Sequence, residues 1–144
     1  METSENVKIP IWFWVVMILM LLWNLMGVGS FLYHALISDE ALQAMPEAER
    51  DLYAKYPAWT YVAFALAVLG GTLGSIGLLL RASWSRMVLL VSLVAIVVQM
   101  YHSLFIAKST EVYGPGAVVM PIMVVLVAVF LVWLAGYAQK RGWV

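Results

Sequence analysis

The sequence predicts an all-α integral membrane protein, a four-helix bundle whose helices run up, down, up and down. Hydrophobic residues make up 65% of the 144 residues and charged residues only 11%, about half the charged share of a soluble domain. Four stretches are free of Asp, Glu, Lys and Arg and about 20 residues long or longer, the length that a helix needs to cross a bilayer. These stretches are 10–37, 58–80, 87–107 and 117–138.

The segment 38–57, between the first two stretches, is predicted to form two short helices on the membrane surface. Asp39 and Glu40 follow Ser38, which suits a helix N-cap followed by acidic residues at the positive end of the helix dipole. Pro46 suits the first position of a second short helix. We interpret the segment as a cap on the bundle, and the alternative is a lid or a docking surface for a partner.

Each apolar stretch carries one line of small or polar residues at three- and four-residue spacing, the pattern by which helices approach each other in lipid. The clearest line lies in the second stretch, where Gly70 and Gly74 form a GxxxG pattern. The residues of this line that we assign to helix packing are Ala63, Ala67, Gly70, Gly74 and Gly77. Four lines that face inward favour a four-helix bundle. The face with Gly70 and Gly74 is also a candidate interface between two copies of the chain.

Short links, 81–86 and 108–116, join the later stretches, and Gly114-Pro115-Gly116 predicts a tight turn into the last one. Cytoplasmic loops carry an excess of Lys and Arg. The side with both termini holds the basic residues Lys8, Arg81, Arg86, Lys140 and Arg141. The other side holds Arg50, Lys55 and Lys108. We therefore expect a multi-pass protein of a bacterial-type inner (plasma) membrane, with both termini in the cytoplasm.

The only two histidines of the chain stand in similar five-residue segments. Tyr33-His34-Ala35-Leu36-Ile37 recurs 68 residues later as Tyr101-His102-Ser103-Leu104-Phe105. Both segments lie near the same end of the predicted bundle, at similar depth, and each histidine lies on the polar line of its helix. We therefore predict that His34 and His102 approach each other inside the half of the bundle that carries the 38–57 segment.

Three hypotheses account for this pair. The imidazoles could hydrogen-bond to neighbours and hold the helices together. They could line a site for a small polar solute such as a sugar, with neutral hydrogen-bonding groups and aromatic walls. They could instead be the two axial ligands of a haem, whereas other metals normally need more ligands than this depth offers. The candidate ligand-binding residues are His34, His102, Asn24, Gln99, Tyr33 and Tyr101.

Several classes of function lack the residues that they need. A net charge of zero without a basic patch argues against nucleic-acid binding. The absence of cysteine excludes thiol chemistry. The apolar stretches contain no Asp, Glu, Lys or Arg, which proton- or sodium-coupled transporters usually place at mid-membrane. We expect no catalytic residues, no metal and no cofactor other than the alternative of a haem.

Two segments resemble a family of small bacterial four-span inner-membrane proteins. One is Trp23-Asn24-Leu25-Met26-Gly27-Val28-Gly29. The other runs from Ser38-Asp39-Glu40-Ala41-Leu42 through Met45-Pro46-Glu47-Ala48-Glu49-Arg50 to Pro57-Ala58-Trp59. The resemblance covers nearly the whole chain, including Gly70-Gly71 and Gly74. Members are mostly uncharacterised and often labelled sugar transporters, so the resemblance implies a four-span fold and favours transport, but it supplies no binding residues.

We therefore predict a single membrane domain, 1–144, that is not an enzyme and that handles or senses a small polar solute in a sugar-transporter-like manner. One alternative is an accessory or assembly subunit of a larger membrane complex. A second is a bis-histidine haem-binding electron carrier. The bilayer is the expected surrounding, and a homodimer is expected if the protein transports, because four spans are few for a complete path.

Overall fold

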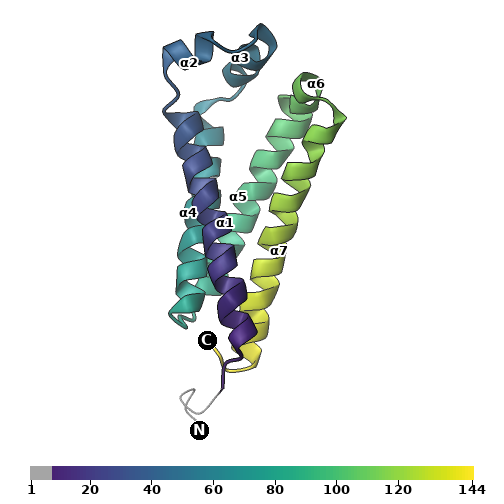
Figure 1. The fold of residues 1–144 in the computed structure, drawn as a ribbon. Coiled ribbons are helices and arrows are strands. Elements are labelled where there is room, and N and C mark those ends of the chain that lie inside the picture. The colour runs from purple at the N-terminus through teal and green to yellow at the C-terminus, as the bar shows by residue number, and fades with distance from the viewer. Residues whose placement is uncertain (1–7) are drawn as a thin grey trace.

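The computed structural model describes residues 8–144, and its regular secondary structure in that range is entirely helical (Figure 1). The four long helices are α1 (Ile11–Ala35), α4 (Ala58–Leu79), α5 (Ser85–Tyr101) and α7 (Val119–Lys140). All four segments are long and apolar enough to cross a membrane, α5 together with the helical turn that follows it. The predicted all-α four-helix bundle is confirmed, and the chain is a multi-pass membrane protein.

Prolines set the starts of three helices. Pro10 precedes α1, Pro57 precedes α4, and Pro46 precedes the short helix α3 (Glu47–Ala54). Each has an extended backbone, with ψ between 149° and 165°, and so occupies the N-cap position. Pro46 therefore lies one residue earlier than the first helical position at which we expected it, because the chain enters α3 in an extended conformation.

The 38–57 segment forms the two short helices that the sequence predicts, α2 (Asp39–Gln43) and α3. The Ser38 hydroxyl accepts a hydrogen bond from the Ala41 N–H at 3.1 Å and so caps α2. Both helices lie over the end of the bundle opposite the termini (Figure 1), which we call the capped end. There α3 contacts another short helix, α6 (Ser109–Tyr113).

The link into the last span is more structured than the predicted tight turn. Helix α6 begins after Lys108, which has a left-handed backbone, and ends at Gly114. Gly114 has φ 91° and ψ 173°, a combination that only glycine adopts readily. A 3-10 helix, η3 (Pro115–Val118), then leads into α7. Helix α6 was not predicted because its five residues of mixed polarity show no helical period.

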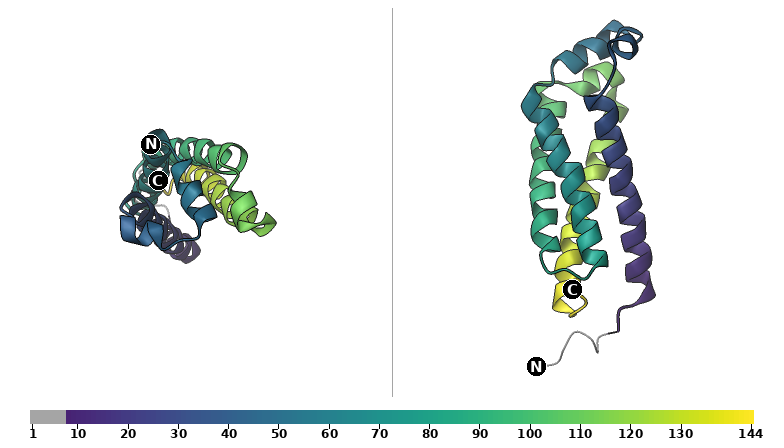
Figure 2. Two further views of the ribbon diagram at one scale, coloured as in Figure 1. Left: turned by 90° about the horizontal axis from the view of Figure 1, so that it is seen from above. Right: turned by 90° about the vertical axis from the view of Figure 1, so that its left-hand side faces the viewer.

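The four long helices pack in chain order, α1 against α4, α4 against α5, and α5 against α7 (Figure 2). At the end that carries the termini, Phe13 and Met17 of α1 join Leu131 and Leu134 of α7 in one apolar cluster with Trp143. Toward the capped end α1 and α7 diverge (Figure 1). The bundle is therefore closed at the termini end and wider at the capped end.

The glycines of α4 lie where α5 approaches most closely. A Cβ atom on Gly70 would lie 3.0 Å from Ser92, and one on Gly74 would lie 2.5 Å from the Leu89 side chain. One on Gly77 would lie 2.8 Å from Trp84. The face with Gly70 and Gly74 is thus occupied by α5 of the same chain, and our candidate interface between two copies is wrong, because intramolecular packing already covers these glycines.

Replacing Gly74 with Ala should destabilise the α4–α5 contact. The added methyl group would force Leu89, which is buried, to move, and such overpacking typically costs ~1–3 kcal/mol. Reversible unfolding in mixed micelles measures the free energy of unfolding. Gly29→Ala is the matched control, because no atom lies within 4 Å of its added Cβ. Equal stability of Gly74→Ala and the unmodified protein would contradict the close packing described here.

Candidate functional site

The two histidines lie in separate aromatic groups. The His34 ring stacks on Tyr53 of α3, with centroids 5.6 Å apart and planes at 17°. The His102 ring contacts Tyr56 at 5.1 Å and stands edge-on to Trp59 at 5.2 Å. Among the described ring contacts, these two groups have no member in common. Each imidazole therefore has its own aromatic neighbours, and no described ring contact joins the two, so the shared site stays a prediction.

The helix geometry differs between the two histidine segments. The Nδ1 atom of His34 bonds to the carbonyl oxygen of Ser30, one turn earlier, at 2.8 Å. His102 instead opens a π-helical turn, η2 (His102–Ile106), in which the Ala107 N–H donates to the His102 carbonyl at 2.8 Å. His102 as a whole is 2% exposed, and its Nδ1 atom has no hydrogen-bond partner among the described residues. The wider turn begins at His102, whose own backbone is α-helical, and it displaces the residues that follow His102.

Tyr33 and Tyr101 lie on the outside of the bundle. Their exposed fractions are 57% and 59%. Adjacent helical residues point about 100° apart around the axis, so Tyr33 and Tyr101 face different directions from the histidines that follow them. Neither tyrosine lines the cavity described next.

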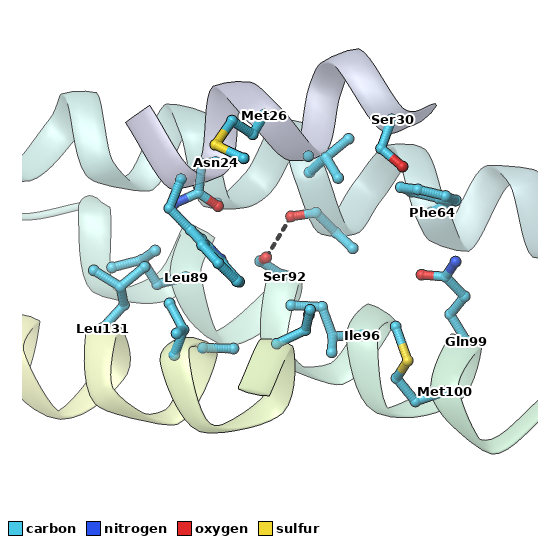
Figure 3. A pocket seen from close by; sticks show the side chains of 18 of the residues that line it. Asn24, Met26, Ser30, Phe64, Leu89, Ser92, Ile96, Gln99, Met100 and Leu131 are labelled. Atoms are coloured by element: carbon cyan, nitrogen blue, oxygen red, sulfur yellow. Dashed lines mark hydrogen bonds between the residues drawn. The ribbon is translucent and has the colours of Figure 1, made fainter. Parts of the chain in front are cut away.

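A cavity of about 320 Å³ lies among all four long helices (Figure 3). Two of the predicted site residues, Asn24 of α1 and Gln99 of α5, line it. The remaining wall is largely apolar and includes Phe64 of α4 and Val124 of α7. None of the described residues that line the cavity is Asp, Glu, His, Lys or Arg.

Asn24 is held in one orientation. Its amide nitrogen donates to the Met20 carbonyl at 2.8 Å and to the Ser75 hydroxyl at 3.3 Å. Since a carbonyl can only accept, the NH₂ group must face Met20, which fixes the position of Oδ1. None of the hydrogen bonds within residues 8–144 involves Oδ1. Asn24 therefore brings an uncommitted acceptor to the cavity near the middle of α1.

Ser30 and Gln99 supply a second polar level. Ser30 lies six residues after Asn24 and lines the cavity, which places it about 9 Å nearer the capped end at the rise of an α-helix. The Gln99 side chain extends toward Ser30 and Phe64 (Figure 3). In the described part of the chain, the Ser30 hydroxyl and the Gln99 amide have no hydrogen-bond partner. Sequence reasoning found Gln99 but missed Ser30, which lies off the polar line that we drew on the first stretch.

Another polar group of the wall, the Ser92 hydroxyl, is satisfied within the protein. The Ser92 hydroxyl donates to the Ala67 carbonyl at 2.6 Å and joins α5 to α4 (Figure 3). Ser92 is buried, so this bond supports the wall and leaves no free donor. The α7 part of the wall is entirely apolar, and apolar residues in an apolar stretch carry no signal of a site in the sequence.

Hydroxyl groups connect the two sides of the capped end. The Tyr56 hydroxyl lies 2.8 Å from the Ser103 hydroxyl, which donates to Ser109 of α6 at 3.3 Å. Beside this chain, burial raises the pKa of the Tyr53 phenol to about 12, and the neighbouring Tyr33 and Tyr113 add to the effect. The cap is thus a packed structure that ties the segment before α4 to the segment after α5.

Comparisons of the chain with protein-family models, with curated proteins and with solved structures find no match. Within the described range, no group of three or more His, Asp or Glu side chains could hold a metal ion.

Replacing Tyr53 with Phe should change how stability depends on pH above 10. The unfolded phenol loses its proton near pH 10 and the folded one near pH 12, so the unfolded chain binds fewer protons in that window and the free energy of unfolding falls as pH rises. In Tyr53→Phe this fall should be shallower, while the ring stacking on His34 is kept. Equal slopes between pH 10 and 12 in denaturant titrations would contradict the raised pKa of the Tyr53 phenol.

Proposed function

We propose that the protein is a non-enzymatic membrane protein that binds one small, uncharged molecule in the cavity among α1, α4, α5 and α7. The observation that carries this proposal is the set of polar groups without a described hydrogen-bond partner that line a largely apolar cavity, namely Asn24 Oδ1, the Gln99 amide and, at the exposed edge, the Ser30 hydroxyl. An unpaired polar group in an apolar environment costs free energy. A ligand that pairs with these groups recovers that cost.

The apolar wall favours a molecule with an apolar body and few polar groups. A sugar has hydroxyl groups on all sides, and most of them would face residues such as Phe64, Ile96 and Leu131 without a partner. The prediction of a sugar-transporter-like function therefore remains a prediction, and an amphipathic ligand fits the lining better. We propose in addition that the protein resides in a bacterial-type inner membrane with both termini in the cytoplasm, on the basis of its Lys and Arg distribution.

A binding function accounts for the cavity better than catalysis or electron transfer. General acid–base catalysis needs a titratable side chain within hydrogen-bond reach of the substrate, and the cavity lining offers none. A haem held by both histidines would need the two imidazoles on one iron, whereas His34 and His102 contact different aromatic groups. No described contact specifically favours the accessory-subunit alternative.

Filling the cavity should abolish binding. Ala128 is buried and lines the cavity on α7, and Val129, the next residue, is 48% exposed and does not line it. We expect Ala128→Leu to weaken binding of the neutral probe 4-fluorobenzyl alcohol about tenfold or more, a loss of ~1.4 kcal/mol per factor of ten. The matched control Val129→Leu should bind like the unmodified protein.

Fluorine NMR of the probe measures this affinity, with empty micelles giving the background of partitioning into detergent. Circular dichroism and thermal unfolding verify that both variants are folded. Signal broadening no greater than that of empty micelles would contradict the proposal. An equal loss of affinity in Ala128→Leu and Val129→Leu would also contradict it, because the effect would then not come from the cavity.

A further inference from the structure

We infer that the ligand is a single-chain lipid with a neutral, hydroxyl-bearing head, and that it enters the cavity sideways from the bilayer between α1 and α7. This inference rests on the proposed function, since it names the class of molecule that the same cavity binds. Three features of the cavity support this inference. They are the position of its opening, the hydrogen bonds that its polar groups can still make, and the volume and lack of charge of its lining.

The cavity opens on the lipid-facing surface. Met26 of α1 and Met120 of α7 both line it, and their exposed fractions are 71% and 57%. A residue that both lines a cavity and is largely exposed marks the edge of its opening. Met26 lies two residues from Asn24 and near the middle of α1, and therefore at the depth of the hydrocarbon core. A molecule at the Met26 edge arrives from lipid, whereas Met120, in the first turn of α7, lies nearer the capped end.

The polar groups specify a hydrogen-bond donor on the ligand. Both N–H bonds of the Asn24 amide are used by Met20 and Ser75, so only the acceptor Oδ1 remains for a ligand. A hydroxyl group satisfies that acceptor, whereas an ester or ketone, which can only accept, does not. About 9 Å nearer the capped end, Ser30 and Gln99 can both donate and accept, which suits a second hydroxyl or carbonyl group.

The lining also excludes a charged head and favours one chain. An ionised carboxylate or phosphate would be buried without a partner, because no described residue of the lining carries a positive charge, and burying an unpaired ion is very costly. The volume of about 320 Å³ is at the low end of small-molecule sites, so it holds no more than part of one chain, and the rest of the chain would extend through the opening into lipid. Alcohols and monoacylglycerols meet these conditions.

Photolabelling of the protein in phosphatidylcholine nanodiscs tests this inference. The probe is a monoacylglycerol with a diazirine in its chain, and labelled residues are identified by mass spectrometry of peptides. We expect labels on cavity residues of α1, α5 and α7, such as Ile96 and Val124. Monoolein should compete with this labelling at least tenfold better than methyl oleate, which lacks a donor, or oleate, which is charged. Equal competition by the three lipids, or labels confined to lipid-facing residues, would overturn the inference.

Two pairs of variants separate head recognition from the route of entry. Gln99→Leu should reduce labelling severalfold without a loss of folding, because the Gln99 side chain has no hydrogen-bond partner among the described residues, and Val98→Leu, on the lipid-facing surface, is its control. Met26→Trp should slow labelling by narrowing the opening, whereas Leu25→Trp, at a neighbouring residue that does not line the cavity, should not. Labelling of Gln99→Leu and Met26→Trp at the level of their controls would overturn the inference.

The two proposals fail in different ways. In one outcome, Ala128→Leu abolishes the binding of 4-fluorobenzyl alcohol, but monoolein does not compete with the photolabelling. The cavity then binds a small molecule, and only the lipid assignment is wrong. In the other outcome, the signal of the fluorinated probe broadens no more than in empty micelles, and the monoacylglycerol labels no cavity residue. The proposed function is then wrong as well.

Discussion

The close approach of α4 to α5 determines the rest of this bundle. Helices in lipid gain little from the hydrophobic effect and associate through close packing and polar contacts. Gly70 and Gly74 let Ser92 and Leu89 approach the α4 backbone, and the Ser92 hydroxyl donates to the Ala67 carbonyl at that point. Helices α4 and α5 form the central pair of the bundle. Helix α1 packs against α4, and α7 packs against α5. The separation of α1 and α7, and the cavity between them, follow from this arrangement.

Asn24 connects the stability of the bundle to its candidate site. Its amide nitrogen bonds to Ser75 and so joins α1 to α4, and Gly71 leaves room for its oxygen, since a Cβ atom there would collide with Oδ1. The same geometry leaves Oδ1 uncommitted at the cavity. A leucine at this position would pack without a polar cost but would lose the bond to α4. One side chain thus serves both helix association and the proposed binding of a ligand.

The sequence predicts the fold because long apolar stretches indicate membrane spans. Small residues at helical spacing, such as Gly70 and Gly74, indicate where two helices pack together. It also predicts Asn24 and Gln99 as cavity residues, because isolated amides in apolar stretches are costly unless they face other protein. The positions of the two histidine rings could not be predicted, since each ring packs against aromatic residues of α3, of the link before α4 or of α4 itself, and helical spacing does not specify these neighbours. The apolar cavity residues of α7, such as Val124, could not be predicted either, because they resemble residues that face lipid.

The ends of the bundle determine how the cavity can be reached. At the termini end, Phe13, Met17 and Leu134 are completely buried in a cluster with Trp143, so that end is closed by packing. At the other end, the hydroxyl groups of Tyr56, Ser103 and Ser109 join the two sides, and α3 contacts α6 above them. With both ends occupied by protein, the gap edged by Met26 and Met120 is the access that these contacts leave. On our proposal, a bundle built in this way exchanges its ligand with the bilayer, and its polar groups pair with a lipid that has a neutral head.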